Sequence, residues 1–340
     1  MSARRILAAA VAIAAGLGLA AYAGASYLLF DAVSAVDPRC GFFEDGTPRF
    51  GAYTPASFGT AGISDAFVAD DFDTAAYAMP DYEEVRFRSR DGIDLVAWWI
   101  PGARPDGPAV ILAHGMGSCR RDPVLLLPAG MLHRNGFAVL LVDLRDQGDS
   151  QVVDGRFSGG TQEYRDVLGA WDWLRASGVA AERIGLLGES NGASTVVIAA
   201  GQEPAIGATW EDSGYSDTSM AIAEEVRRAG YPEALTVGGR LWALLFGIDL
   251  DALRPVDAVA KIGDRPLMVV HGLHDDRVQP HHALDFVRAL QVARGEGGRF
   301  VEPWLVPGAE HVQAAFVQPE EYERRLVAFF GAALGRPLGP

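Results

Sequence analysis

The chain has 340 residues, of which 49% are hydrophobic and 21% charged, so it can bury a core and is neither disordered nor fibrous. Its 29 basic and 44 acidic residues give a net charge of −15 with a single lysine, Lys261, and the lack of clustered cations excludes a nucleic-acid-binding protein. Two cysteines, Cys40 and Cys119, exclude a disulfide-dense scaffold and a four-cysteine zinc site, although they could pair in an oxidising compartment.

The amino terminus carries a long apolar segment. Residues 6–30 contain no charged side chain and follow Arg4 and Arg5. A helix of this length spans roughly 37 Å, enough to cross a hydrocarbon core about 30 Å thick. The segment is either an uncleaved membrane anchor or a secretory signal with a small-x-small cleavage site at residues 21–23.

We favour the anchor because the run stays apolar through Phe30, which is long for the core of a signal peptide. A buried core helix is a weaker alternative, since such helices rarely run this long without a polar face. In either main case the two arginines stay cytoplasmic and the rest of the chain crosses the membrane. We therefore expect a single-pass membrane protein with its folded domain outside the cytoplasm, or a secreted or periplasmic protein after cleavage.

Residues 31–80 are rich in Gly, Pro, Ala and Asp and show no helical or strand period, which predicts an irregular lead-in segment. A clear pattern begins after it. Residues 84–88 and 93–100 have the character of two strands, and Asp91-Gly92 between them favours a tight turn, so we expect an antiparallel hairpin.

The rest of the chain alternates short apolar runs with helical segments. This alternation predicts a mostly parallel sheet with helices on both faces, in a domain over residues 81–336. The expected strands after the hairpin are residues 109–113, 137–142, 184–187, 206–210, 267–270 and 300–306. The expected helices are residues 122–134, 161–177, 191–201, 217–229, 280–293 and 319–334.

The interval between the strands that end at Trp210 and begin at Leu267 is longer than one crossover needs, and residues 241–246 within it are strongly apolar. These features predict a small cap insertion at about residues 213–262 over the carboxyl edge of the sheet. An additional helix packed on the core is the alternative.

The most informative motif is Gly188-Glu189-Ser190-Asn191-Gly192, a G-x-S-x-G sequence between an apolar strand and a helical run of small residues. A serine on a sharp strand-to-helix turn exposes its hydroxyl, and the glycines allow strand and helix to approach closely. The following helix points its amides and positive dipole end at the site. Ser190 is therefore the candidate nucleophile.

A nucleophilic serine needs a histidine base and an acid that orients it. Strand 267–270 is followed by Asp275 and Asp276, and strand 300–306 is followed by His311. Open α/β sheets place their sites at the carboxyl ends of such strands. The order serine, acid, histidine therefore predicts a catalytic triad, with Asp212 after an earlier strand as a second possible acid.

With these motifs the chain resembles the α/β-hydrolase superfamily over roughly residues 82–334, especially bacterial serine aminopeptidase-like and prolyl-oligopeptidase-like hydrolases. The resemblance implies an eight-stranded sheet, selects Asp275 as the acid, and implies an oxyanion hole built from the amides of Met116 and Asn191. The motifs that carry it are His114-Gly-Met-Gly117, Asp143-Leu-Arg-Asp-Gln-Gly-Asp-Ser150, the Ser190 turn, His271-Gly-x-x-Asp275 and Gly308-x-x-His311.

The chain departs from these relatives at two places. It has Asp146-Gln147 where they usually carry Gly-His, and Glu189 and Asn191 flank the serine where they often have His or Tyr and Met. Glu189 could tune His311 or face a partner in the core, and the sequence leaves both open.

The other residues that could bind a metal or a cofactor do not form a recognisable binding motif. The histidines at 271, 274, 281 and 282 with Asp275 and Asp276 lack a fixed metal-ligand spacing, so we expect no metal. Gly115 and Gly117 lack the third glycine of a dinucleotide fingerprint. We expect His114 to shape its loop and Cys119 to be a buried small residue.

The sequence thus predicts a serine hydrolase that acts through Ser190, His311 and Asp275, without a cofactor, on a small carboxylic ester or thioester. A serine peptidase or aminopeptidase is the main alternative, with Glu224-Glu225 as a candidate pair for a substrate ammonium. A non-catalytic binding protein on the same scaffold, or a cofactor-free lyase or acyltransferase, are further alternatives.

Overall fold

The computed structural model describes residues 3–40, 47, 50–69, 72–296 and 301–335. Its centre is one eight-stranded sheet of order β1-β2-β4-β3-β5-β6-β7-β8. The strands β1 and β2 form the expected antiparallel hairpin, β2 pairs antiparallel with β4, and all other pairs are parallel. The strands are β1 Glu83–Arg88, β2 Asp94–Ile100, β3 Ala109–Ala113, β4 Ala138–Val142, β5 Ile184–Glu189, β6 Ala208–Asp212, β7 Leu267–Gly272 and β8 Trp304–Val306.

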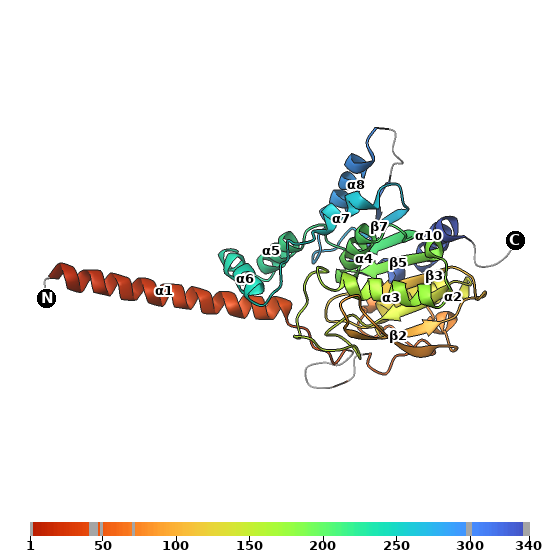
Figure 1. The fold of residues 1–340 in the computed structure, drawn as a ribbon, viewed down its shortest axis with the longest axis horizontal. Helices are drawn as coiled ribbons and strands as arrows, with labels where there is room; N and C mark the ends of the chain where they lie inside the picture. Colours follow the sequence, from red (N-terminus) through yellow and green to blue (C-terminus); the bar gives the residue numbers. More distant parts are fainter. Residues whose placement is uncertain (1–2, 41–46, 48–49, 70–71, 297–300, 336–340) are drawn as a thin grey trace.

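Helices cover both faces of this sheet (Figure 1). Side chains alternate between the two faces: Ile111 belongs to a core cluster with residues of α3, α4, α7 and α8, whereas Leu112 on the same strand belongs to a cluster with residues of α2, α9 and α10. This two-sided burial explains why the strands are continuous apolar runs. The helices are α2 Pro123–Arg134, α3 Tyr164–Ala176, α4 Asn191–Gln202, α7 Pro255–Ile262, α8 His281–Arg294, α9 Ala314–Val317 and α10 Pro319–Leu334.

The expected strands and helices lie where the sequence placed them, with small differences at their ends. The strand expected from residue 206 begins at Ala208, and the last strand, expected from Phe300, begins at Trp304, while Phe300 itself lies outside the described residues. The helices α7 and α9, and a helix at Ala234–Leu245, were not among the expected ones. Short 3-10 turns lie at Asp65–Phe67, Thr74–Tyr77 and Ala181–Arg183.

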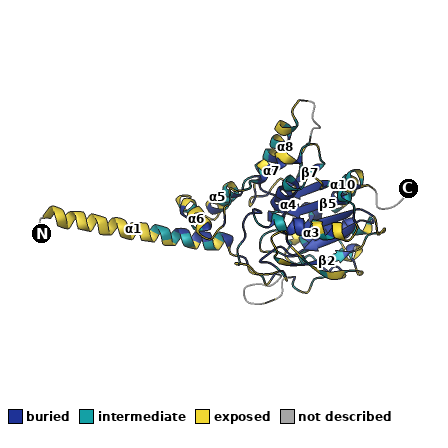
Figure 2. Ribbon diagram, viewed as in Figure 1, coloured by how far each residue is buried: buried dark blue, intermediate teal, exposed yellow. Residues whose placement is uncertain are grey.

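The apolar amino-terminal segment forms one helix, α1 (Ala3–Ser34), which projects away from the sheet (Figure 1). Its first part is exposed along its whole circumference, and only its last part contacts the domain (Figure 2). Among the described residues it is the one helix long and apolar enough to cross a membrane. The alternative of a buried core helix is therefore wrong.

The lead-in segment after α1 is irregular and packs on the domain. Cys40 and Cys119 form a disulfide, with their Cα atoms 5.8 Å apart, so Cys119 is buried as expected but not as a thiol. Farther along, Met79 is fully buried, and Tyr77 packs so closely on α2 that only a glycine fits at Gly130. The segment is thereby fixed to the domain at two points.

The predicted insertion contains α5 (Thr218–Arg228), α6 (Ala234–Leu245) and α7. In Figure 1, α5 and α6 lie beside the sheet-and-helix body, near the end of α1. In contrast, α7 belongs to the layer that covers the sheet: Ala258 and Val259 join the core, and Ala258 approaches Gly201 of α4 closely.

Candidate active site

Ser190 occupies a strained turn between β5 and α4. Its backbone has φ 55° and ψ −121°, a conformation that non-glycine residues rarely adopt. A side chain at Gly188 would collide with the backbone of Gly192, and one at Gly192 would collide with the backbone of Ala113. The two glycines of the motif are therefore required for this turn.

His311 links the serine to an acid. Its Nε2 lies 2.9 Å from Ser190 Oγ, and its Nδ1 lies 2.7 Å from Asp275 Oδ2. Because an ionised carboxylate only accepts hydrogen bonds, Nδ1 carries the ring proton and Nε2 accepts from the serine hydroxyl. The structure thus brings together three side chains from the ends of β5, β7 and β8, as the sequence predicted.

Asp275 is held in its charged state. Its burial opposes ionisation, but hydrogen bonds from His271 and His311 outweigh this effect and lower its pKa below the usual value. Its Oδ1 also accepts from the backbone N–H groups of Arg277 at 3.0 Å and Val278 at 2.8 Å. These hydrogen bonds hold the Asp275 carboxylate in position to accept from His311 Nδ1.

The two other candidate acids lie elsewhere. Asp212 accepts hydrogen bonds from Tyr322 Oη at 2.8 Å and from Ser213 Oγ at 2.9 Å. Asp276 is exposed and lines the cavity near the serine. The structure therefore pairs His311 with Asp275 rather than with either alternative.

The loop after β3 lies against the serine. A Cβ placed on Gly115 would be 3.2 Å from Ser190 Cβ, and Met116 lines the same cavity as Ser190. In the described part of the chain, no protein group accepts a hydrogen bond from the backbone N–H of Met116 or Asn191. Both amides are therefore available to a substrate oxygen.

His114 holds this loop in place. Its Nε2 accepts from Leu144 N–H at 3.0 Å, so its Nδ1 carries the proton and donates to Gly115 O at 2.8 Å. Burial lowers its pKa, which keeps the ring neutral. These bonds agree with a structural role for His114.

Two residues that depart from the family pattern have positioning roles that sequence reasoning missed: Gln147 holds the loop after β3, and Asp146 holds the loop at residues 153–155. Gln147 Oε1 accepts from Gly117 N–H at 2.6 Å, one residue beyond Met116. Asp146 has φ 65°, and its Oδ1 accepts from three consecutive backbone amides, those of residues 153–155. Asp tolerates this conformation better than most residues because its side chain can bond locally. The departure of Asp146-Gln147 from the family pattern was the signal in the sequence that could have revealed these roles.

Glu189 lies directly beside the nucleophile and is buried. Burial raises its pKa well above the usual value, and the carboxylates of Asp212 and Asp122 reinforce the shift. Burial therefore favours the neutral form of the Glu189 carboxyl next to Ser190.

The cavity above Ser190 has a volume of about 340 Å³ and a mixed lining. Apolar side chains come from the lead-in segment, the β3 loop, α2 and the loop after β8. Acidic and basic side chains come from the turn before α2, the end of β5, α5 and the loops after β7 and β8. The lining includes Phe50, Ile63, Met116, Val124, Asp122, Glu189, Arg228, Asp276, Arg277 and Glu310.

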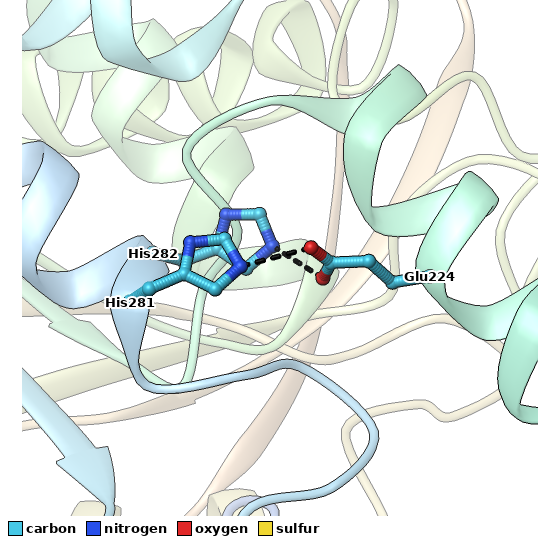
Figure 3. Close-up of side chains that lie close together, drawn as sticks. All are labelled: Glu224, His281 and His282. Atoms are coloured by element: carbon cyan, nitrogen blue, oxygen red, sulfur yellow. Dashed lines mark hydrogen bonds and ion pairs between the residues drawn. The ribbon is translucent and has the colours of Figure 1, made fainter.

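Glu224, His281 and His282 gather where α5 meets α8 (Figure 3). Glu224 contacts His281 Nε2 at 2.9 Å and His282 Nε2 at 3.2 Å. Such a set could hold a metal ion only if both Nε2 atoms were unprotonated. However, Ser216 N–H donates to His282 Nδ1 at 3.2 Å, so the proton of that ring lies on Nε2 and points to Glu224. The cluster is thus a satisfied hydrogen-bond network that ties α5 to α8.

A model of the prolyl oligopeptidase family matches residues 128–337, which include all three linked side chains. The chain belongs to the prolyl oligopeptidase family. Together with the eight-stranded sheet, this membership confirms the predicted α/β-hydrolase fold and the serine hydrolase class.

Individual relatives agree with this placement. A thiohydrolase, aneE, from Aspergillus aculeatus is 32% identical over 120 residues, which are 35% of this chain and 37% of that protein. An esterase from Pyrococcus furiosus superposes with a TM-score of 0.63 at 24% identity, over 79% of this chain and 97% of that one. A puromycin-hydrolysing peptidase from Mycobacterium tuberculosis superposes with a TM-score of 0.60 at 21% identity, over 78% of this chain and 41% of that one. These structures share the fold.

Proposed function

We propose that this member of the family cleaves a carboxylic ester or thioester through an acyl-enzyme on Ser190. The observation that carries the proposal is the unbroken hydrogen-bond chain from Ser190 through His311 to Asp275. Ser190 Oγ attacks the carbonyl carbon while His311 Nε2 takes its proton, then returns it to the leaving group. Asp275 keeps the other ring proton on Nδ1, and water releases the acid in a second, equivalent step.

We assign the oxyanion hole to the backbone amides of Met116 and Asn191. Neither amide has a partner among the residues that the structure describes, and Asn191 begins α4, so the positive end of the helix dipole supports the negative oxygen. Losing one such donor typically costs about 2.7–4 kcal/mol of transition-state stabilisation.

Peptide hydrolysis is the second candidate, because family membership favours it. One feature argues against an aminopeptidase. Glu224 is bonded to His281 and His282, and Glu225 is paired with Arg228, so neither carboxylate is left to bind a substrate ammonium. The names of the thiohydrolase and the esterase relatives also favour an acyl ester or thioester.

We further propose that α1 anchors the protein in a membrane and that the domain lies outside the cytoplasm, with α5 and α6 forming its cap. The exposure of the apolar part of α1 and the two arginines before it support this topology. The Cys40–Cys119 disulfide supports an oxidising compartment. A secreted form released by cleavage after residue 23 remains the alternative location.

The test of the mechanism is covalent labelling with a fluorophosphonate probe. We expect the wild-type protein to be labelled and Ser190→Ala to be unlabelled, while Ser219→Ala, a serine outside the cavity, stays labelled. Labelling of Ser190→Ala would reject the nucleophile, and an unlabelled wild-type protein would favour a non-catalytic binding protein.

The bond that is cleaved can then be identified with p-nitrophenyl esters, acyl thioesters and aminoacyl p-nitroanilides. We expect the first two classes to be hydrolysed faster than the third. Product analysis with an added alcohol separates hydrolysis from acyl transfer.

A further inference from the structure

One face of α6 packs along the end of α1. Tyr22 Oη donates to Ala234 O at 2.6 Å and accepts from Gly238 N–H at 3.1 Å. Trp242 Nε1 donates to Ala23 O at 3.0 Å. Ser26 leaves no room for a side chain at Gly238. These contacts run from one end of α6 to the other, so the helix lies alongside residues 22–30 of α1.

The opposite face of α6 is apolar and exposed. Val237, Leu241, Leu244 and Leu245 are each between 55% and 75% exposed. At 3.6 residues per turn they share an arc of about 100°, roughly opposite the mean direction of the buried residues Gly238, Gly239 and Ala243. We call these four residues the α6 apolar face. Large aliphatic side chains grouped in this way on an exposed surface mark an interaction site.

The position of this face along α1 identifies its partner. The last charge before the apolar run is Arg5, and a hydrocarbon core about 30 Å thick takes roughly 20 helical residues, which ends near residue 25. α6 packs at this same level of α1. Tyr22, Tyr27 and Trp242 lie there together, with the Tyr27 and Trp242 rings 5.2 Å apart. Tyr and Trp are typical of membrane–water interfaces.

The charged groups near α6 are compatible with this position. Arg240, beside the α6 apolar face in the helix, is paired with Asp251, and Arg227 before the helix is paired with Glu233. Long arginine side chains at an interface can keep their charge in the headgroup layer while their stems contact apolar surroundings.

We propose that the α6 apolar face inserts into the same lipid bilayer that α1 spans, on the side where the domain lies. The proposal rests on the membrane anchoring proposed above for α1. A bilayer fits better than a protein partner because the helix that carries this face packs along α1 at the level where α1 would leave the hydrocarbon core.

The contact links the membrane to the catalytic cavity. Arg228, the last residue of α5, lines that cavity, and α6 begins six residues later. α5 is also tied to α8 through Glu224. The insertion of α6 therefore holds the rim of the cavity at the membrane surface.

The test uses the full chain reconstituted in phosphatidylcholine vesicles. Both native cysteines are in a disulfide, so an introduced cysteine can be labelled alone with an environment-sensitive fluorophore. Leu245→Cys probes the α6 apolar face, and Leu17→Cys probes the exposed part of α1. Val292→Cys, which is exposed on α8, is the matched control. Nitroxide-labelled lipids then report the contact of each probe with acyl chains.

We expect the label at position 245 to shift its emission to shorter wavelength and to be quenched by lipids with the nitroxide near the carbonyl end of the acyl chain. The label at 17 should be quenched by nitroxides deep in the chain, and the label at 292 by neither. A quenched label at 17 with a label at 245 that behaves like the one at 292 would overturn the inference and leave the anchor standing. An unquenched label at 17 would overturn both.

Discussion

The Cys40–Cys119 disulfide closes a loop of about 80 residues that joins the lead-in segment to the domain. A cross-link restricts the unfolded chain, and the chain-entropy relation gives about 4.5 kcal/mol at 25 °C for a loop of this length. Cys119 is fully buried and packs with Cys40 and Phe50, so removing both sulfur atoms also loses some packing. We therefore expect the double variant Cys40→Ala/Cys119→Ala to lose about 3–5 kcal/mol of unfolding free energy.

The measurement is urea unfolding of the full chain in detergent, followed by tryptophan fluorescence. Three samples separate the causes: the oxidised wild type, the wild type under reductant, and the double variant. Reduction keeps both side chains, so the reduced wild type isolates the cross-link from the packing. If neither reduction nor substitution lowers the unfolding free energy by as much as about 1 kcal/mol, the entropic account is wrong for this loop.

Three further predictions concern the site. Asp275→Asn keeps an oxygen that accepts from the amides of Arg277 and Val278, but its amide group donates to His311 and forces the ring proton onto Nε2. We therefore expect kcat to fall by about 10⁴-fold, while circular dichroism shows that the variant still folds. Gln147→Ala frees the Gly117 amide and loosens the oxyanion loop, so kcat should fall roughly tenfold, whereas Gln151→Ala, outside the cavity, should leave it unchanged. Burial raises the pKa of Glu211 from 4.5 to about 8, so the folded state holds its proton more tightly than the unfolded state and stability falls as the pH rises from about 4.5 to 8. Between pH 5 and pH 7 this group should cost the wild type about 2.5 kcal/mol of unfolding free energy, and Glu211→Gln should remove this loss in urea unfolding at the two pH values. The exposed Glu182→Gln should keep the wild-type pH dependence.

The elements that the sequence predicted are those with a strong local signal. Strands such as β3 are continuous apolar runs because helices cover both faces of the sheet. The turn at Ser190 is encoded by five consecutive residues. Such patterns can be recognised without knowledge of the fold, because burial and backbone geometry there depend on neighbouring residues in the sequence. The fold and the convergence of Ser190 with His311 could therefore be anticipated.

Roles that depend on distant partners could not be anticipated. Gln147 departs from the family pattern in the sequence, but only the folded loop shows that its Oε1 accepts from Gly117, 30 positions away. The Glu224-Glu225 pair had the character of a substrate site, yet the fold gives Glu224 two histidine partners from α8. In each case a hydrogen bond between separate elements decides the role, and no local pattern encodes it.

The acids around the nucleophile show how one fold gives similar groups different charges. Glu189, Glu211 and Asp212 end the neighbouring strands β5 and β6, and burial raises the pKa of all three. Asp275 is also buried, but it receives hydrogen bonds from two histidines and two backbone amides, and its pKa falls. The negative charge of Asp275, which lies at His311 Nδ1, therefore stabilises the positive imidazolium that forms on His311. The raised pKa of Glu189 favours its neutral form, which reduces the negative charge that would otherwise repel the oxyanion beside Ser190.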